Sequence, residues 1–150
     1  MVTVREAVEA DLPALMRLYV ELAISGPPVG EDAHLQPQIR AAFADIKRDS
    51  RQVLLVAEVD GQVAGTLALF VLPNLSYGGA PWAVIENVVV ASAHRRRGVG
   101  RALMLEAIER ARRAGCYKIQ LCSNLQRREA HAFYESLGFK TTHRQFRMDL

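Results

Sequence analysis

Apolar residues recur along the chain with two periods, and the shorter period predicts strands. The expected strands cover residues 2–8, 53–59, 63–72, 84–90 and 117–121, with one or two more in 139–150. Asp60-Gly61 separates the second and third of these runs. Because Asp-Gly between two apolar runs favours a tight turn, these two strands are expected to form a β-hairpin.

The longer period, with apolar residues three or four positions apart, predicts helices in most of the remaining chain. The expected helices cover residues 11–24, 35–46, 102–114 and 128–137. Asp11 offers an N-cap for the first helix, and Gly115 suits the end of the third. This order of elements predicts a mixed α/β (α+β) fold in a single domain spanning residues 1–150.

The connection between the strand at 84–90 and the next helix is rich in arginine and glycine. It reads Arg95-Arg96-Arg97-Gly98-Val99-Gly100-Arg101. The first turn of a helix leaves backbone N–H groups free and carries partial positive charge, which favours phosphate. Glycines let a ligand approach the backbone, and arginines add donors. We expect a phosphate site, although three arginines are also typical of a solvated charge run or a nucleic-acid patch.

Composition and charge narrow the class of protein. Of 150 residues, 50% are hydrophobic and 23% are charged, with a formal net charge of +3, which is typical of a globular domain. The positive excess is local, which favours a small polyanion over nucleic acid. Cys116 and Cys122 lie too far apart on one strand for a disulfide, and no cluster suggests a metal. We expect a cytoplasmic protein, because neither a signal peptide nor a membrane-spanning stretch is found.

Three segments share their order and spacing with a known family. They are Glu86-Asn87-Val88-Val89-Val90, Arg95-x-x-Gly98-x-Gly100 and Ala130-His131-Ala132-Phe133-Tyr134-Glu135-Ser136-Leu137-Gly138-Phe139. With the element order, they resemble the GNAT superfamily of acetyl-CoA-dependent N-acetyltransferases across the whole chain. The resemblance implies a mostly antiparallel sheet flanked by about four helices, with a splayed parallel strand pair that holds coenzyme A. A further segment, Gly115-Cys116-Tyr117-Lys118-Ile119, is locally similar to glucosamine-6-phosphate N-acetyltransferases.

The resemblance also implies which residues bind the cofactor. Backbone N–H groups from Arg96 to Arg101 would hold the pyrophosphate, and strand backbone would pair with the pantetheine arm. The implied set is Val88, Val89, Val90, Arg95, Arg96, Arg97, Gly98, Val99, Gly100 and Arg101. Where many members have asparagine this chain has Arg127, and Asn124 lies three residues earlier. Contact with the cofactor by Asn124, Arg127 or Arg128 therefore stays open.

The implied reaction is acetyl transfer from acetyl-CoA to a primary amine of a small molecule or peptide, directly within a ternary complex. Glu86 would act as the base, alone or through a water, or bind the substrate. Tyr134 would protonate the leaving thiolate, although it also suits a core position on an amphipathic helix. Tyr77 and Trp82, with Glu86, would line the acceptor pocket, because aromatic faces and a carboxylate suit an ammonium group.

Other functions remain open alongside this one. A non-catalytic acetyl-CoA-binding sensor or interaction module would keep the cofactor site without turnover. The identity of the amine is not indicated by the sequence. The C-terminal strands would offer a surface for a homodimer.

Overall fold

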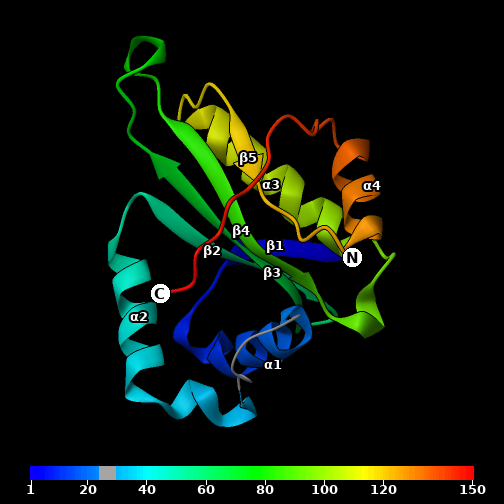
Figure 1. The fold of residues 1–150 in the computed structure, drawn as a ribbon. Coiled ribbons are helices and arrows are strands. Elements are labelled where there is room, and N and C mark those ends of the chain that lie inside the picture. The colour runs from blue at the N-terminus through cyan, green and yellow to red at the C-terminus, as the bar shows by residue number, and fades with distance from the viewer. Residues whose placement is uncertain (24–29) are drawn as a thin grey trace.

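The computed structural model describes residues 1–23 and 30–150, in which a five-stranded sheet carries helices on both faces (Figure 1). The strands are β1 (Val2–Glu6), β2 (Gln52–Val59), β3 (Gln62–Leu72), β4 (Trp82–Val90) and β5 (Ile119–Leu121). The α-helices are α1 (Leu12–Leu22), α2 (Pro37–Arg48), α3 (Val99–Arg113) and α4 (Arg128–Ser136). The strands lie in sequence order, and only β4 and β5 pair in parallel. The predicted α+β fold, with its parallel strand pair, is confirmed.

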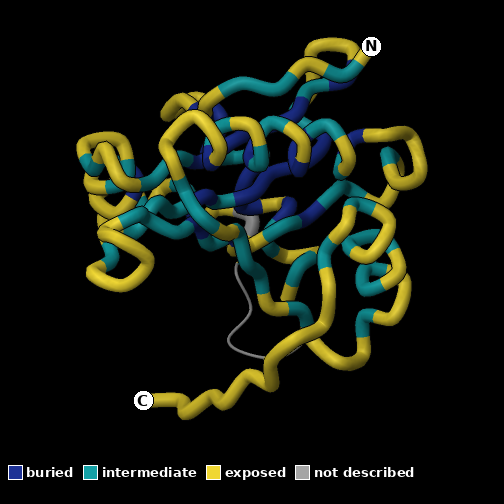
Figure 2. The backbone as a smooth tube through the Cα atoms, turned by 90° about the horizontal axis from the view of Figure 1, so that it is seen from above, coloured by how far each residue is buried: buried dark blue, intermediate teal, exposed yellow. Residues whose placement is uncertain are grey.

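The two faces of the sheet bury separate apolar clusters. One cluster joins β2, β3 and β4 to α3, with Leu67, Leu103 and Met104 fully buried within it. The other joins the opposite face of the sheet to α1 and α2, around Leu15 and Phe43. Figure 2 shows the buried segments at the centre of the molecule. No helix in the described part of the chain is long and apolar enough to cross a membrane.

The predicted hairpin forms at Asp60 and Gly61, both of which have positive φ, at 51° and 77°. Positive φ at both central residues is the requirement of the turn that best matches strand twist. Helix ends differ from the expected ones by a few residues. Residue 24, the expected end of the first helix, lies outside the described residues.

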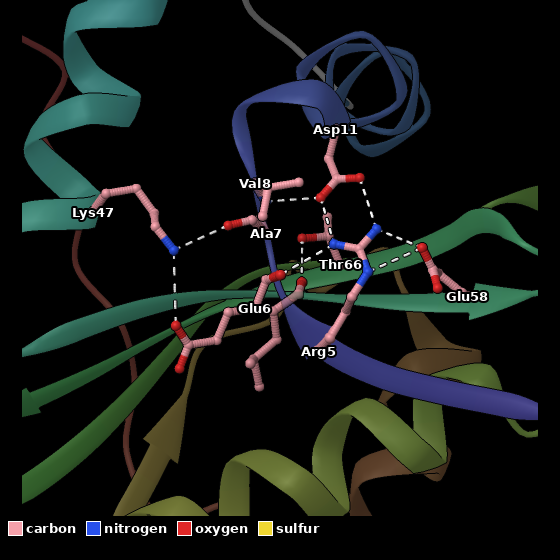
Figure 3. Close-up of polar contacts among 9 residues, drawn as sticks. Arg5, Glu6, Ala7, Val8, Asp11, Lys47, Glu58 and Thr66 are labelled. Carbon is pink, nitrogen blue, oxygen red and sulfur yellow. Dashed lines mark hydrogen bonds and ion pairs between the residues drawn. The ribbon is translucent and has the colours of Figure 1, made fainter.

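Asp11 does not cap α1 with its side chain as the sequence suggested. Its carboxylate accepts the Val8 N–H at 2.8 Å and two hydrogen bonds from the Arg5 guanidinium, at 2.7 and 2.9 Å (Figure 3). Arg5 also reaches Glu58 on β2. The hydrogen bonds from Arg5 lower the pKa of the Asp11 carboxyl group. This network fastens β1 and the start of α1 to the sheet.

The prediction of one or two strands in residues 139–150 is wrong. Residues 140–150 form neither strand nor helix, and every one of them is exposed. Phe146, Met148 and Leu150 alternate as in a strand but are 89%, 83% and 116% exposed. Alternation alone does not make a strand, because the backbone also needs a hydrogen-bonding partner. The tail instead extends away from the body (Figure 2).

Candidate active site

The two parallel strands diverge after a short pairing, and the region between their diverging backbones is called the opening below. β4 pairs with β5 only from Ala83 to Ile85, opposite Ile119 to Leu121. Past this point β4 continues to Val90, whereas the chain after β5 turns toward α4. The pantetheine-binding strand pair that the family resemblance implied is therefore splayed in this structure.

A β-bulge in β4 lies where the strands separate. Glu86 pairs with Ala68 and Val89 pairs with Thr66, so β4 holds one more residue than β3 over this stretch. Asn87 takes a φ of 54°, which is uncommon outside glycine. Such a bulge bends the strand and redirects its side chains. Glu86 and Asn87 are consequently both exposed, between the buried Ile85 and Val89.

The arginine-glycine turn before α3, where a phosphate site was predicted, contains residues with left-handed backbone. Gly98 is the N-cap, with φ of 81° in the left-handed region, and Arg96 has φ of 60°. A turn in which right-handed and left-handed residues alternate directs successive N–H groups to one side, where they can bind an anion. Helix geometry leaves the first N–H groups of α3 without intrahelical acceptors. Its first turn contains no acidic residue.

Two glycines serve close packing around this loop. A Cβ on Gly100 would lie 3.4 Å from Phe133 and 3.5 Å from Val90, so α4 comes close to α3 at Gly100 while a methyl group would still fit. A Cβ on Gly65 in β3 would lie 3.0 Å from both the Val89 carbonyl oxygen and the Val99 side chain. Gly65 thus lets the first residue of α3 rest directly on the sheet. The sequence analysis did not identify Gly65, whose signal is a glycine inside a strand.

The arginines predicted to bind the cofactor fall into two groups. Arg95 donates to the Val90 carbonyl at 3.3 Å and lies 3.5 Å from Glu21 of α1. Arg127 donates to the carbonyl of Leu22 at the end of α1. Arg95 is itself exposed, as are Arg96, Arg97, Arg101 and Arg128, whereas Arg127 is half-buried. Arg95 and Arg127 therefore contact protein groups, although Arg95 also remains open to solvent.

Asn124 shapes the start of α4. Its side-chain oxygen accepts the Gln126 N–H at 2.9 Å, and its carbonyl accepts the Arg127 N–H at 3.0 Å. The same carbonyl lies 2.9 Å from Nε2 of His131. The structure thus gives Asn124 a local role in the turn before α4.

The two candidate catalytic side chains lie on β4 and α4. Partial burial raises the pKa of the Glu86 carboxyl group, which is still open to solvent. Tyr134 is half-buried beside Phe133 and Phe139, with ring centroids 5.4 and 6.1 Å apart. Burial raises the pKa of the Tyr134 phenol, and the nearby Arg127 cation acts in the opposite direction. The shift moves the pKa of Glu86 toward neutral pH, which suits a base, and the shift of Tyr134 keeps its phenol protonated, as a proton donor must be.

Tyr77 and Trp82 contact Tyr117 and Lys118, which immediately precede β5, rather than Glu86. Tyr77 stacks on Tyr117 with ring centroids 4.1 Å apart, and Lys118 Nζ lies 4.7 Å from the Trp82 ring centroid. Trp82 is four residues from Glu86 along β4, about 13 Å by strand geometry. The sequence analysis named Tyr117 and Lys118 within the segment similar to glucosamine-6-phosphate N-acetyltransferases, but not as residues of the acceptor pocket. No group of three or more potential metal ligands occurs within 1–23 and 30–150.

Known proteins share both this sequence pattern and this structure. Residues 12–139 match the model of the acetyltransferase (GNAT) family. A glucosamine 6-phosphate N-acetyltransferase of Trypanosoma brucei brucei is 33% identical over 95% of this chain and 91% of its own length. A transcriptional regulator from Bacillus halodurans has a TM-score of 0.91 and 37% identity over the whole of both chains. A putative acetyltransferase from Agrobacterium tumefaciens has a TM-score of 0.88 and 36% identity over 99% of both. The chain belongs to the GNAT family of acetyltransferases.

Proposed function

We propose that residues 1–150 work as one domain that transfers the acetyl group of acetyl-CoA to a primary amine of a small molecule or peptide. The carrying observation is the position of the splayed β4–β5 pair next to the start of α3. A strand edge without a partner can accept an extended amide chain, and the free N–H groups of a helix start can accept phosphates.

The cofactor would lie along a path from the sheet to the helix. The backbone of Val88, Val89 and Val90 would pair with the amides of the pantetheine arm, since their other edge pairs with β3. The N–H groups from Arg96 to Arg101 would receive the pyrophosphate. The exposed guanidinium groups of Arg96, Arg97 and Arg101 would add charge there.

The transfer itself removes two protons from the acceptor nitrogen and delivers one to sulfur. Glu86, directly or through a water, would take the first proton from the ammonium group, so that the amine nitrogen can attack the thioester carbonyl carbon. The new C–N bond forms, the nitrogen gives up its second proton to water, and the C–S bond breaks. Tyr134 would deliver a proton to the departing thiolate, and the Val88 N–H would stabilise the oxyanion of the intermediate. No covalent enzyme intermediate is required, so transfer is direct within a ternary complex.

The acceptor would enter from the exposed side of Glu86. Trp82 and Tyr77 would contact the part of the acceptor that lies away from the reacting amine. Lys118, which lies over Trp82, would suit an anionic group on the acceptor. The relative from Trypanosoma brucei brucei is named for a phosphorylated amino sugar, which has both an amine and an anionic group.

The test is release of free thiol from acetyl-CoA across a panel of amines. The panel covers amino sugars and their phosphates, amino acids, polyamines and a peptide with a free N-terminus. We expect turnover above the rate without amine for at least one class, and N-acetyl product by mass spectrometry. Tight acetyl-CoA binding with no turnover for any amine would instead support the alternative, a non-catalytic acetyl-CoA sensor.

We also propose a homodimer that uses the C-terminal tail. The tail has alternating apolar residues with no cover, and β5 has one neighbour in the sheet of the described chain, β4. A second copy could supply a tail strand to that edge, which would bury both exposed surfaces.

A further inference from the structure

The last turn of α1 contacts both sides of the opening between β4 and β5. We call these sides its walls: one is the end of β4 with the segment that follows it, and the other is the start of α4. On the β4 side, the Glu21 carboxylate accepts the Ser92 N–H at 2.9 Å and pairs with Arg95. On the β5 side, Arg127 at the N-cap of α4 donates to the Leu22 carbonyl. The end of α1, the end of β4 and the start of α4 lie at the same end of the sheet (Figure 1). Two adjacent residues therefore join the two walls.

Both contacts have favourable chemistry. The Leu22 carbonyl belongs to the last turn of α1, where carbonyls lack intrahelical donors and a cation is favoured. The Glu21 contacts use an ionised acceptor, which makes hydrogen bonds stronger than those between neutral groups. Arg95 also donates to the Val90 carbonyl, so Glu21 is tied to the end of β4 twice.

The strands cannot set the width of the opening by themselves. The β4–β5 ladder ends at Ile85 and Leu121, and the bulge at Asn87 bends β4 just beyond it. In the part of the chain that the structure describes, the α1 turn supplies hydrogen bonds to both sides past this point. The separation of the walls must then depend on contacts such as these.

We propose that Glu21 and Arg127 are positioning residues, which hold the two walls of the cofactor opening at a fixed separation through the last turn of α1. This inference rests on the proposed function, because it assumes that the pantetheine arm occupies the opening. Arg127 also lies near enough to Tyr134 for its charge to act on the phenol. Loss of the bridge would then displace α4 and its tyrosine together.

A direct contact of Arg127 with a cofactor phosphate is the competing explanation, and phosphate-free ligands separate the two. We compare the dissociation constants of CoA and of pantetheine, which has no phosphate, for the wild-type protein, Glu21→Ala, Arg127→Ala and the double variant. A bridge predicts that each single variant weakens both ligands by the same factor, roughly tenfold. The double variant should bind both ligands only slightly more weakly than either single variant, because loss of one contact already breaks the bridge.

Two control variants each remove one arginine or one glutamate that lies outside the proposed bridge. Arg128→Ala changes the neighbouring exposed arginine, and Glu109→Ala changes a carboxylate on α3 that pairs only loosely with Arg113, at 3.7 Å. We expect Arg128→Ala to spare pantetheine binding and Glu109→Ala to spare both ligands. Glu21→Gln, which keeps an acceptor for the Ser92 N–H, should recover most of the affinity lost in Glu21→Ala. A loss confined to CoA, or additive losses in the double variant, would overturn the bridge.

Amide hydrogen exchange in the ligand-free protein tests the bridge without the cofactor. Glu21→Ala should speed exchange at Ser92, and Arg127→Ala should speed exchange in the last turn of α1 and at Ser92. Unchanged exchange at Ser92 in Arg127→Ala would show that the two contacts are uncoupled and would reject the proposal. If the wild-type protein bound neither CoA nor pantetheine, the proposed function would fail, and the exchange measurement would still decide the bridge.

Discussion

Neighbouring arginines in this site have different partners, although their side chains are chemically identical. Arg95, although exposed like Arg96 and Arg97 next to it, contacts Val90 and Glu21. Sequence spacing predicted a phosphate-binding turn but could not assign Glu21 to Arg95, because Glu21 lies on α1, 74 residues earlier in the chain. The same holds for Arg127, whose acceptor is a backbone carbonyl without any sequence signature.

At Tyr134, we expect Tyr134→Phe to lower kcat about a hundredfold, the lower range for loss of a general acid. The acetyl-CoA dissociation constant should stay within twofold, because the ring still packs between Phe133 and Phe139. Steady-state thiol release and calorimetry measure the two quantities. Tyr117→Phe, at a tyrosine stacked on Tyr77, is the control and should retain kcat. An unchanged kcat in Tyr134→Phe would remove it as the proton donor.

At Glu86, the pH profile is the informative measurement. Burial raises the pKa of this carboxyl group, and a base acts only when it is unprotonated. We expect kcat/KM to fall as the pH drops through the raised pKa, at a higher pH than for an ordinary glutamate. Glu86→Gln should remove this acidic limb and lower the plateau about a hundredfold. If the limb persisted in Glu86→Gln, the titrating group would be another residue.

At the scale of elements, local signals predicted more than contacts between distant segments did. The hairpin at Asp60 and Gly61 follows from turn chemistry, and the four helices follow from apolar spacing. The β4 bulge at Asn87 was not predicted, because a run of apolar residues does not show which residue opposes which on the next strand. The prediction of C-terminal strands was wrong because the apolar alternation was present, but no partner strand pairs with these residues in the described structure.

The loop before α3 depends more on the backbone conformation at Gly98 than on the space at Gly100. Gly98→Ala must hold φ near 81°, which costs about 1 to 2 kcal/mol for a residue with a side chain. We expect a melting temperature lower by several degrees and weaker CoA binding. Gly100→Ala places its Cβ in ordinary contact with Phe133, so both quantities should change less.

Scanning calorimetry and CoA titration compare these two variants with Gly30→Ala. A Cβ at Gly30 has no neighbour within 4 Å, and its φ of −71° suits any residue. Equal losses in Gly98→Ala and Gly30→Ala would show that the loop does not need a left-handed residue.

At the scale of the whole molecule, the β5 edge of the sheet is incompletely covered. All three residues of β5 are half-buried, and α4 contains no fully buried residue. The tail, which carries exposed Phe146 and Met148, extends from this same side. The structure of one chain therefore leaves apolar surface on both the edge and the tail.

We expect light scattering to give a molar mass twice the 16.6 kDa of one chain. Phe146→Asp with Met148→Asp should shift it to a single-chain mass, because charges would then face the apolar edge. Gln145→Asp with Arg147→Asp changes the intervening face and should leave a dimer. A wild-type protein of single-chain mass at high concentration would reject the dimer, and the tail would then have to pair with its own sheet.

Gly65 has a consequence for how mutational data on this protein should be interpreted. Even alanine would bring a Cβ to 3.0 Å from both the Val89 carbonyl and the Val99 side chain, where backbone and helix start leave little room to move. A saturation library at this position, screened for acetyl transfer, should therefore return glycine almost exclusively. Such a screen would rank Gly65 with the reacting side chains, although its contribution is the absence of any atom where α3 meets the sheet.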